Sequence, residues 1–374
     1  MSFHAARISK LLAWMEETDI DVSVVTSPAN VRYLSGFYSN PHERFMGVII
    51  PRKGTPFLIV PALDREKAEA EGTLPVHTHS DTDNAVDILV GVLDSDAAAI
   101  SQVAIEKSQM SVARLEELQS RFSNAKYANV EDRLTAMRMR KDGEELSLMR
   151  QAAQLADEAV AFAVTQMVPG KMEYELVQAI ESFVKRQGAD RMAFETMVLA
   201  GEKSALPHGE PGTREIRKGD FVLVDLGIVW KGYCSDITRT FAVGDISEKQ
   251  REIYEAVRRA NAAAIQAVKP GVGAGVIDRA ARDVIEDAGF GEFFIHRVGH
   301  GLGIDIHEPP SMHGNNEQPL VPGMMFTIEP GVYIPGMGGV RIEDDVLVTE
   351  TGVEVLTSYP KELRILPVHV LNVE

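Results

Sequence analysis

The last two-thirds of the chain contain an internal repeat, and this repeat restricts the fold more than any single motif does. A Pro-Gly pair at 169–170 is followed by a helix-like segment and Gly188, and the same layout returns 101 residues later, from Pro270 to Gly289. Further along, the run Gly219–Gly227 aligns with Gly323–Gly331 at an offset of 104 residues. The repeat predicts a domain built from two similar halves that a pseudo-twofold axis relates.

Each half places one carboxylate at the end of an apolar run and a second one a short hairpin later. Asp225 and Glu329 end the two runs; Asp236 follows 11 residues after Asp225, and Glu343 follows 14 residues after Glu329. An ionised carboxylate in an apolar setting costs several kcal/mol unless it is paired or binds a metal. The repeat predicts that the four acids meet at one axis and share such a partner.

One histidine breaks the symmetry. His300 lies in a glycine-rich stretch where the backbone can approach a ligand closely, and its counterpart in the first half is Gly201. Four carboxylates balance the charge of two divalent cations, whereas one cation would leave a repelling excess. Oxygen-rich ligation with one imidazole favours manganese, with cobalt, zinc or iron as alternatives, and the absence of cysteine ligands argues against a structural zinc site. Paired metals of this kind favour hydrolysis.

Composition narrows the class of protein. The chain has 374 residues, 45% of them hydrophobic, which is enough for two domains, and its net charge of -17 disfavours nucleic acid or an anionic membrane as a partner. The one cysteine, Cys234, excludes an internal disulfide, and we expect it to be a packed side chain rather than a nucleophile. The first residues lack a secretion signal, and no apolar run approaches the roughly 20 residues of a membrane span. We therefore expect a cytoplasmic location.

The first third of the chain is predicted to form a separate α/β domain. Apolar spacing and turn residues predict helices and strands that alternate, with a turn at 27–30. We place the domains at residues 1–130 and 131–374. The expected helices are 5–18, 62–71, 84–93 and 111–122, and the expected strands are 22–25, 46–50 and 57–60.

Four separated motifs then carry a resemblance to a known family. They are Asp225–Arg239 (DLGIVWKGYCSDITR), Gly299–Pro309 (GHGLGIDIHEP), Thr327–Gly331 (TIEPG) and Arg341–Glu343 (RIE). Together they resemble the pita-bread metallopeptidases, above all the Xaa-Pro dipeptidases (prolidases) and the Xaa-Pro aminopeptidases. The likeness spans roughly residues 140 to 360, and the first third resembles the creatinase-type domain that precedes the catalytic domain in these enzymes. The implied fold class is α/β (α+β), with a duplicated pita-bread domain.

The resemblance implies a role for each candidate ligand. Two metals would be bound, Asp236 and Glu343 would bridge them, and a bridging hydroxide would attack the peptide bond. Glu329 would also carry the proton of the attacking water. The implied metal ligands are Asp225, Asp236, His300, Glu329 and Glu343.

The resemblance also implies roles around the metals. His208 and His307 would hold the scissile carbonyl and stabilise the oxyanion, and His296 would line the substrate pocket; its alternative is a loop residue without a role. Arg341 would orient an acidic ligand, Asp236 by our expectation, through a bidentate contact; its alternative is a surface strand position. Trp230 departs from the family, in which tyrosine is common at this position.

The expected substrate is a small peptide with proline in second position. The bond before proline lacks an N–H, so a dedicated enzyme is needed for it. We expect a dipeptidase, in which His42 and Arg44 capture the substrate carboxylate, reaching across a homodimer; the alternative for this segment is a charged surface loop. The alternative functions are an Xaa-Pro aminopeptidase (aminopeptidase P) acting on longer peptides, and another metal-dependent pita-bread hydrolase or lyase.

Overall fold

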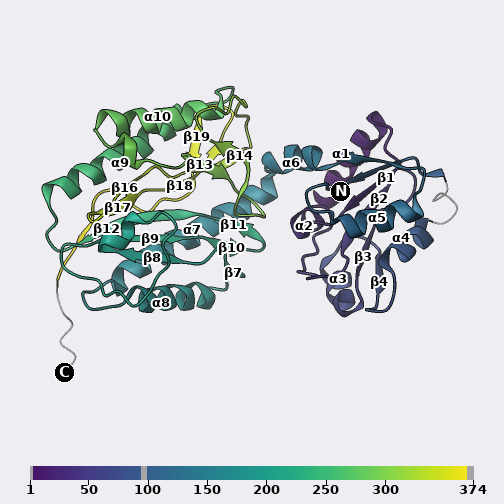
Figure 1. The fold of residues 1–374 in the computed structure, drawn as a ribbon, viewed down its shortest axis with the longest axis horizontal. Coiled ribbons are helices and arrows are strands. Elements are labelled where there is room, and N and C mark those ends of the chain that lie inside the picture. Colours follow the sequence, from purple (N-terminus) through teal and green to yellow (C-terminus); the bar gives the residue numbers. More distant parts are fainter. Residues whose placement is uncertain (1–2, 94–98, 369–374) are drawn as a thin grey trace. The chain divides into compact units, whose positions relative to one another are not determined.

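The chain forms two compact units, Met1–Arg138 and Met139–Glu374. The computed structural model describes residues 3–93 and 99–368. Within these ranges no helix combines the length and the apolar character that a membrane span requires. Figure 1 shows the elements of both units in the colours of the sequence.

A six-stranded mixed sheet forms the centre of the first unit, in the order β4-β3-β2-β1-β5-β6. The first three strands in the sequence are buried throughout, which explains their continuous apolar runs. The expected helices and strands of this unit are confirmed to within a few residues. In chain order the elements are α1 (Phe3–Glu17), β1 (Val22–Val25), α2 (Pro28–Ser35), β2 (Gly47–Pro51), β3 (Phe57–Pro61), η1 (Ala62–Asp64), α3 (Arg65–Glu71), β4 (Val76–His79), α4 (Ala85–Leu93), β5 (Gln102–Ile105), α5 (Val112–Arg121), β6 (Lys126–Asn129) and α6 (Glu131–Met139), whose last residue belongs to the second unit.

The turn expected at residues 27–30 is wrong, because these residues begin helix α2. Ser27 is the N-cap, and its hydroxyl accepts a hydrogen bond from the backbone N–H of Asn30 at 3.3 Å. Pro28 occupies the first helical position, where its missing N–H costs nothing. A Ser-Pro pair starts a helix as readily as a turn, and here the buried carboxylate of Glu106 also accepts from the N–H of Ser27 at 2.8 Å.

The second unit repeats one arrangement twice. Each half has two helices followed by three strands in which all neighbours are antiparallel: α7, α8, β8, β9 and β12 in the first half, and α9, α10, β13, β15 and β18 in the second. The duplication expected from the sequence is therefore confirmed. The elements are α7 (Gly143–Gln166), α8 (Glu173–Arg186), β7 (Arg191–Met192), β8 (Met197–Ala200), η3 (Gly201–Ala205), β9 (Phe221–Leu226), β10 (Ile228–Trp230), β11 (Tyr233–Cys234), β12 (Ile237–Val243), α9 (Glu248–Ala267), α10 (Ala274–Asp287), η4 (Gly291–Phe293), β13 (Gly299–Gly301), β14 (Glu308–Met312), β15 (Met325–Ile328), β16 (Gly331–Ile334), β17 (Gly338–Arg341), β18 (Asp344–Val348), β19 (Val353–Val355) and β20 (Ile365–Leu366).

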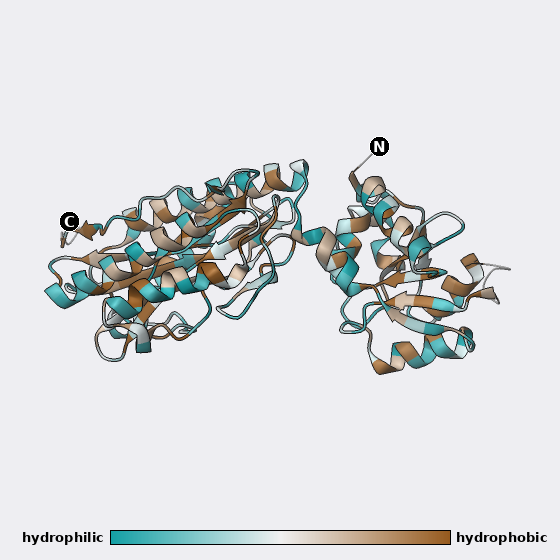
Figure 2. Cartoon of the chain, turned by 90° about the horizontal axis from the view of Figure 1, so that it is seen from above, coloured by the Kyte–Doolittle hydropathy of each residue, from teal (hydrophilic) through white to brown (hydrophobic). Residues whose placement is uncertain are grey.

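Each half also has its own apolar core. One cluster joins α7 and α8 to the inner side chains of β8, β9 and β12, and the other joins α9 and α10 to those of β15, β17 and β18. Figure 2 shows the brown, hydrophobic strands of this unit against helices whose other faces are teal. The two cores hold the two sheets rigidly, so the residues at the strand ends are placed by buried packing rather than by surface loops.

Candidate metal centre

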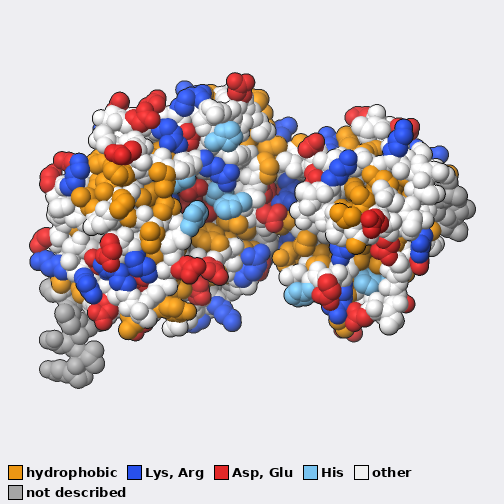
Figure 3. Space-filling view, viewed as in Figure 1, with side chains coloured by type: hydrophobic (Ala, Val, Ile, Leu, Met, Phe, Trp, Pro, Cys, Tyr) orange, Lys and Arg blue, Asp and Glu red, His pale blue; other side chains and the backbone are white. Residues whose placement is uncertain are grey.

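The strand ends of both halves face one cavity of about 370 Å³. Figure 3 shows pale blue histidine side chains around a hollow in this unit, with red carboxylate atoms within it. All five expected metal ligands and the three expected histidines contribute to its wall. The lining residues are Phe194, Met197, Pro207, His208, Asp225, Asp236, His296, Arg297, His300, Ile306, His307, Glu329, Arg341 and Glu343.

Hairpins bring the second carboxylate of each half back to the first. Between Asp225 and Asp236 the chain forms hairpin β10–β11, whose turn residues Lys231 and Gly232 both have positive φ, 47° and 81°, as a tight two-residue turn requires. In the second half, hairpin β16–β17 lies in the equivalent position, between Glu329 and Glu343. The sequence expectation of one hairpin between the paired acids is confirmed in both halves.

Three of the expected ligands form a compact group. One ligand atom each of Asp236, His300 and Glu343 lies within 4.8 Å of the others, and all three side chains are buried. Nε2 of His300 is 3.7 Å from Oδ2 of Asp236 and 3.5 Å from Oε1 of Glu329. Asp225 lines the same cavity from strand β9. The structure thus collects the five side chains in one place.

The orientation of His300 suits a metal ligand. Burial lowers the pKa of His300 to about 3, and the neighbouring His307 ring, 4.1 Å away between centroids, adds to this effect, so the imidazole is neutral. Its Nδ1 lies 3.1 Å from the carbonyl oxygen of Gly301 and must donate to it. The lone pair is therefore on Nε2, which faces the carboxylates, as in metal sites where a carbonyl fixes the histidine tautomer.

The carboxylates of this cluster are buried close to one another, which disfavours their ionised forms. Oδ1 of Asp225 and Oδ1 of Asp236 are buried without a hydrogen-bond partner among the described residues. Burial, with repulsion from neighbouring carboxylates, raises the pKa of Asp236 and of Glu343 well above their usual range. Burial likewise raises the pKa of Glu329 to about 7, although Arg341 opposes the shift. Oxygen donors with one imidazole fit one or two divalent cations, which would relieve this repulsion.

The expected contact of Arg341 with Asp236 is wrong, because Arg341 donates to Asp225 instead. Its Nη2 lies 2.5 Å from Oδ2 of Asp225, a single contact rather than a bidentate one. Register explains the difference: Asp225 lies opposite Thr238 in the β9–β12 pair, and Nε of Arg341 also donates to the Thr238 hydroxyl at 3.2 Å. The backbone N–H of Asp236 is bonded to Asp345 at 3.0 Å. Arg341 is buried, which excludes the surface alternative.

The three other histidines border the cavity on their own segments. Nε2 of His296 is 2.9 Å from the hydroxyl of Tyr333, which accepts a bond from Nη1 of Arg341 at 2.8 Å, so His296 is connected to the expected ligand Asp225. Burial lowers the pKa of His296 to about 4 and also lowers the pKa of His307. His208 lies on the segment after η3 and lines the same cavity.

Several residues that support the site were missed in the sequence. The Thr327 hydroxyl accepts from the N–H of His300 at 3.1 Å and donates to Glu329 at 3.3 Å, and the Thr238 hydroxyl donates to Glu343 at 2.6 Å. Each threonine lies two positions from an expected carboxylate ligand, as Arg341 does. Side chains two apart in a strand share one face, and this spacing was the signal that could have found them. No comparable spacing in the sequence pointed to Arg297 or Tyr333.

Four other residues singled out in the sequence lie outside the wall of this cavity. His42 and Arg44 belong to the first unit; His42 is exposed, and Arg44 donates to both carboxylate oxygens of Asp81 at 2.7 and 3.3 Å. Trp230 is in hairpin β10–β11, and its Nε1 has no partner among the described residues. Cys234 is buried, which raises the pKa of its thiol to about 12, so it is not a nucleophile.

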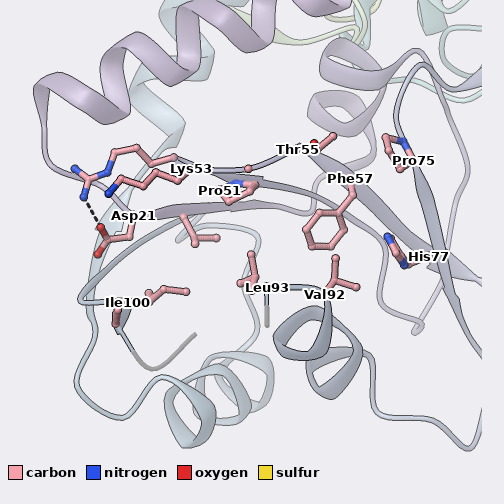
Figure 4. A pocket seen from close by; sticks show the side chains of 14 residues that line it. Asp21, Pro51, Lys53, Thr55, Phe57, Pro75, His77, Val92, Leu93 and Ile100 are labelled. Carbon is pink, nitrogen blue, oxygen red and sulfur yellow. Dashed lines mark hydrogen bonds and ion pairs between the residues drawn. The ribbon is translucent and has the colours of Figure 1, made fainter. Parts of the chain in front are cut away.

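The first unit has a larger cavity, about 580 Å³, without comparable chemistry (Figure 4). Apolar side chains such as Phe57 and Leu93 form much of its wall. Among its described lining residues the one carboxylate is Asp21, which pairs with Arg52 at 2.6 Å and accepts from the N–H groups of residues 101 and 102. Cavity size alone would therefore select the wrong site.

Carboxylates and one imidazole at the centre of a duplicated fold define a metal-dependent enzyme, and comparison with known proteins gives its family. The profile of metallopeptidase family M24 matches residues 147–350, and that of the creatinase/prolidase N-terminal domain matches residues 7–140. The chain belongs to metallopeptidase family M24. It has the pita-bread catalytic domain of that family, preceded by the creatinase-type domain.

Close relatives span nearly the whole chain. The Bacillus subtilis protein YkvY is 45% identical over 361 residues, covering 96% of this chain and 99% of YkvY. The crystal structure of the prolidase from Pyrococcus horikoshii has a TM-score of 0.88 at 36% identity, covering 96% of this chain and 99% of that one. The X-Pro aminopeptidase from Thermotoga maritima has a TM-score of 0.86 at 31% identity, covering 94% and 100%. Since these two enzymes differ in activity, the substrate must be argued from the site.

Proposed function

We propose that the enzyme uses two divalent cations, manganese by preference, to hydrolyse the peptide bond before proline in Xaa-Pro dipeptides. The observation that supports this proposal most is the buried cluster of Asp236, His300 and Glu343, next to carboxylate oxygens that have no hydrogen-bond partner among the described residues. Asp225, Asp236, His300, Glu329 and Glu343 would hold the cations. Two such cations activate a water molecule at neutral pH and polarise a carbonyl.

Glu329 is the carboxylate best placed to move a proton. Its side chain is 18% exposed, against 6% for Asp236 and 12% for Asp225, so it has the greatest access to the cavity of these three. A general base must reach the proton that it removes, and a carboxylate at the cavity surface meets this condition. The hydroxyl of Thr327 holds Oε1 of Glu329 at 3.3 Å and thereby orients the group.

His208 and His307 are proposed to receive the substrate carbonyl. Both line the cavity, and His307 packs edge-on against the His300 ring, which places it beside the ligand cluster. A positioned donor at the developing oxyanion is typically worth about 3–4 kcal/mol. Replacing His307 by Ala should therefore lower kcat by roughly two orders of magnitude while the metal content stays unchanged.

Arg297 supports the choice of a dipeptide over a longer peptide. It lines the cavity, its Nη1 donates to the Ser311 hydroxyl at 2.8 Å, and its charge contributes to lowering the pKa of both His300 and His307, so it lies close to them. A guanidinium keeps donors for a carboxylate after one such bond. A carboxylate directly after the proline residue is the group that distinguishes a dipeptide. The cavity, about 370 Å³, is at the small end of ligand pockets, which span roughly 300–1,000 Å³.

The test compares an Xaa-Pro dipeptide with an Xaa-Pro-Yaa tripeptide on the manganese-loaded enzyme. We expect higher kcat/KM for the dipeptide. Arg297→Met should raise KM for the dipeptide at least tenfold and change the tripeptide little, because a hydrogen bond to a charged group contributes about 1.5–3 kcal/mol. Arg297→Lys keeps the charge and should lose less. A wild-type preference for the tripeptide would change the assignment to aminopeptidase P.

Asp236→Ala tests the metal chemistry itself. The variant should have no metal-dependent hydrolysis, and turnover of the wild type should cease with a chelator and return with added Mn²⁺. Turnover that persists in chelator would contradict the proposal. Metal-dependent cleavage of a phosphorus or sulfur bond, with no cleavage of Xaa-Pro peptides, would identify a different hydrolase or lyase.

We also propose that the enzyme is a cytoplasmic homodimer in which His42 and Arg44 reach the neighbouring site. Arg44 is bonded to Asp81 within its own unit, so the exposed His42 is the residue more available for such a contact. Sedimentation analysis tests the homodimer, and the kinetics of His42→Ala test the contact with the neighbouring site. A monomer with unchanged kinetics would contradict them.

A further inference from the structure

A fully buried carboxamide connects the backbone segments that carry the two proposed glutamate ligands. Asn261 is on helix α9, which carries none of the proposed ligands, and its Nδ2 donates to the carbonyl oxygen of Ile328 at 3.1 Å and to that of Ile342 at 3.3 Å. Each of these carbonyls belongs to the residue directly before a proposed ligand, Glu329 or Glu343. One side chain therefore ties together the two backbone positions from which both glutamates project.

The other end of the carboxamide is held by a charge network of Lys361, Asp344 and Arg239. Oδ1 of Asn261 accepts a bond from Nζ of Lys361 at 3.0 Å, and the same ammonium donates to Asp344 at 2.8 Å. Asp344 also accepts from Arg239 at 2.8 Å, and Arg239 donates to the backbone carbonyl of Glu343. Because an ammonium can only donate, Oδ1 must face Lys361 and the amino group must face the two carbonyls.

We infer that Asn261 is a positioning residue that sets the separation of Glu329 and Glu343, and with it the binding of the second metal. The inference rests on the proposed two-metal site. Metal ligands must be held to within about 0.5 Å of their working geometry. Loss of a residue that orients metal ligands typically changes metal affinity 10–100-fold. Aspartate would lack the two donors, and leucine would lack the donors and the acceptor.

The decisive variant is Asn261→Leu, which has a similar shape and no hydrogen-bonding group. When Mn²⁺ is titrated into the metal-free protein, the weaker of the two sites should bind at least tenfold more weakly than in the wild type. The electron paramagnetic resonance signal of an exchange-coupled Mn²⁺ pair should be missing at a metal concentration that saturates the wild type. Neither readout depends on turnover. A general loss of stability would not by itself weaken Mn²⁺ binding at one site and leave the other unchanged.

Two control variants remove comparable contacts away from the ligands. Tyr254→Phe deletes a bond of 3.2 Å from the same helix to the carbonyl of Lys361. Asn30→Leu deletes a buried carboxamide of the first unit, whose Nδ2 donates to Glu106 at 2.6 Å. Both variants should lose stability and keep the Mn²⁺ affinities of the wild type.

Wild-type affinity at both sites of Asn261→Leu would overturn the inference. If that variant does not fold, Asn261→Ser, whose short side chain with one donor cannot bridge both carbonyls, should also bind the second Mn²⁺ more weakly than the wild type, and equal affinity would again overturn the inference. A wild type that binds fewer than two Mn²⁺ would overturn the two-metal site itself. That result is distinct from a loss confined to the Asn261 variants.

Discussion

The proposed metal ligand Glu329 allows a prediction about stability that needs no catalytic assay. Burial among like charges raises the pKa of Glu329 from an ordinary 4.5 to about 7. At 1.36 kcal/mol for each pH unit, the ionised carboxylate is about 3 kcal/mol less stable in the folded metal-free protein than in the unfolded chain. Glu329→Gln replaces it with a neutral group of the same shape. The variant should therefore be more stable than the wild type wherever the carboxylate is ionised.

The direction in which this stability difference changes with pH follows from proton binding. A carboxyl whose pKa is higher in the folded state binds more protons there than in the unfolded chain, so the stability it confers falls as pH rises from about 4.5 to about 7. Near pH 4.5 the metal-free wild type and Glu329→Gln should be about equally stable. At pH 8 the variant should exceed the wild type by about 3 kcal/mol. Removing this charge also relieves Asp236 and Glu343, whose pKa values are raised partly by Glu329, so their response has the same sign.

The chain offers a clean reporter for this experiment. It has two tryptophans, Trp14 in the first unit and Trp230 in the second. In a Trp14→Phe background, Trp230 fluorescence follows urea unfolding of the second unit alone, with chelator present, at pH 5 and pH 8. Saturating Mn²⁺ at pH 8 should reverse the order, because only the wild type keeps the full ligand set and is stabilised by bound metal. A variant less stable than the wild type at pH 8 without metal, or a difference that does not change with pH, would refute the reasoning.

Two other substitutions have expected outcomes. Arg341→Lys should weaken Mn²⁺ binding about 10–100-fold in calorimetry, because one ammonium cannot replace the bonds to Asp225, Tyr333 and the Thr238 hydroxyl; unchanged affinity would count against a role in holding Asp225. Cys234→Ala should keep the activity of the wild type, and iodoacetamide should leave the native enzyme active, since burial raises the pKa of the thiol to about 12; rapid inactivation with labelling of Cys234 would contradict this.

The fold and the ligand cluster could be predicted because short stretches of the sequence, each an apolar run that ends in a carboxylate, indicate them. A carboxylate that ends an apolar run is unusual in any protein, and its repetition pairs Asp225 with Glu329 at an offset of 104 residues and Asp236 with Glu343 at an offset of 107. Antiparallel strands joined by short hairpins then bring each pair together, as the structure shows. These inferences need periodicity and burial, not the details of packing.

The supporting residues were not predictable in the same way, because their partners depend on strand register. Arg341 reaches Asp225 since strand β9 places that residue opposite Thr238, whereas the expectation drawn from the resemblance was a contact with Asp236. Asn261 is a lone polar residue in a helix, and its two bonds connect residues 67 and 81 positions further along. Helix α2 was missed for another reason: Ser-Pro begins helices and turns alike.

The central claim is that five side chains from two duplicated halves hold two metals, and one crystallographic measurement tests it most directly. Crystals of the Mn²⁺-loaded enzyme, measured at the manganese absorption edge, should show two anomalous peaks roughly 3.5–4 Å apart among Asp225, Asp236, His300, Glu329 and Glu343. A single peak, or peaks outside this cluster, in an enzyme that still cleaves Xaa-Pro dipeptides would contradict the account.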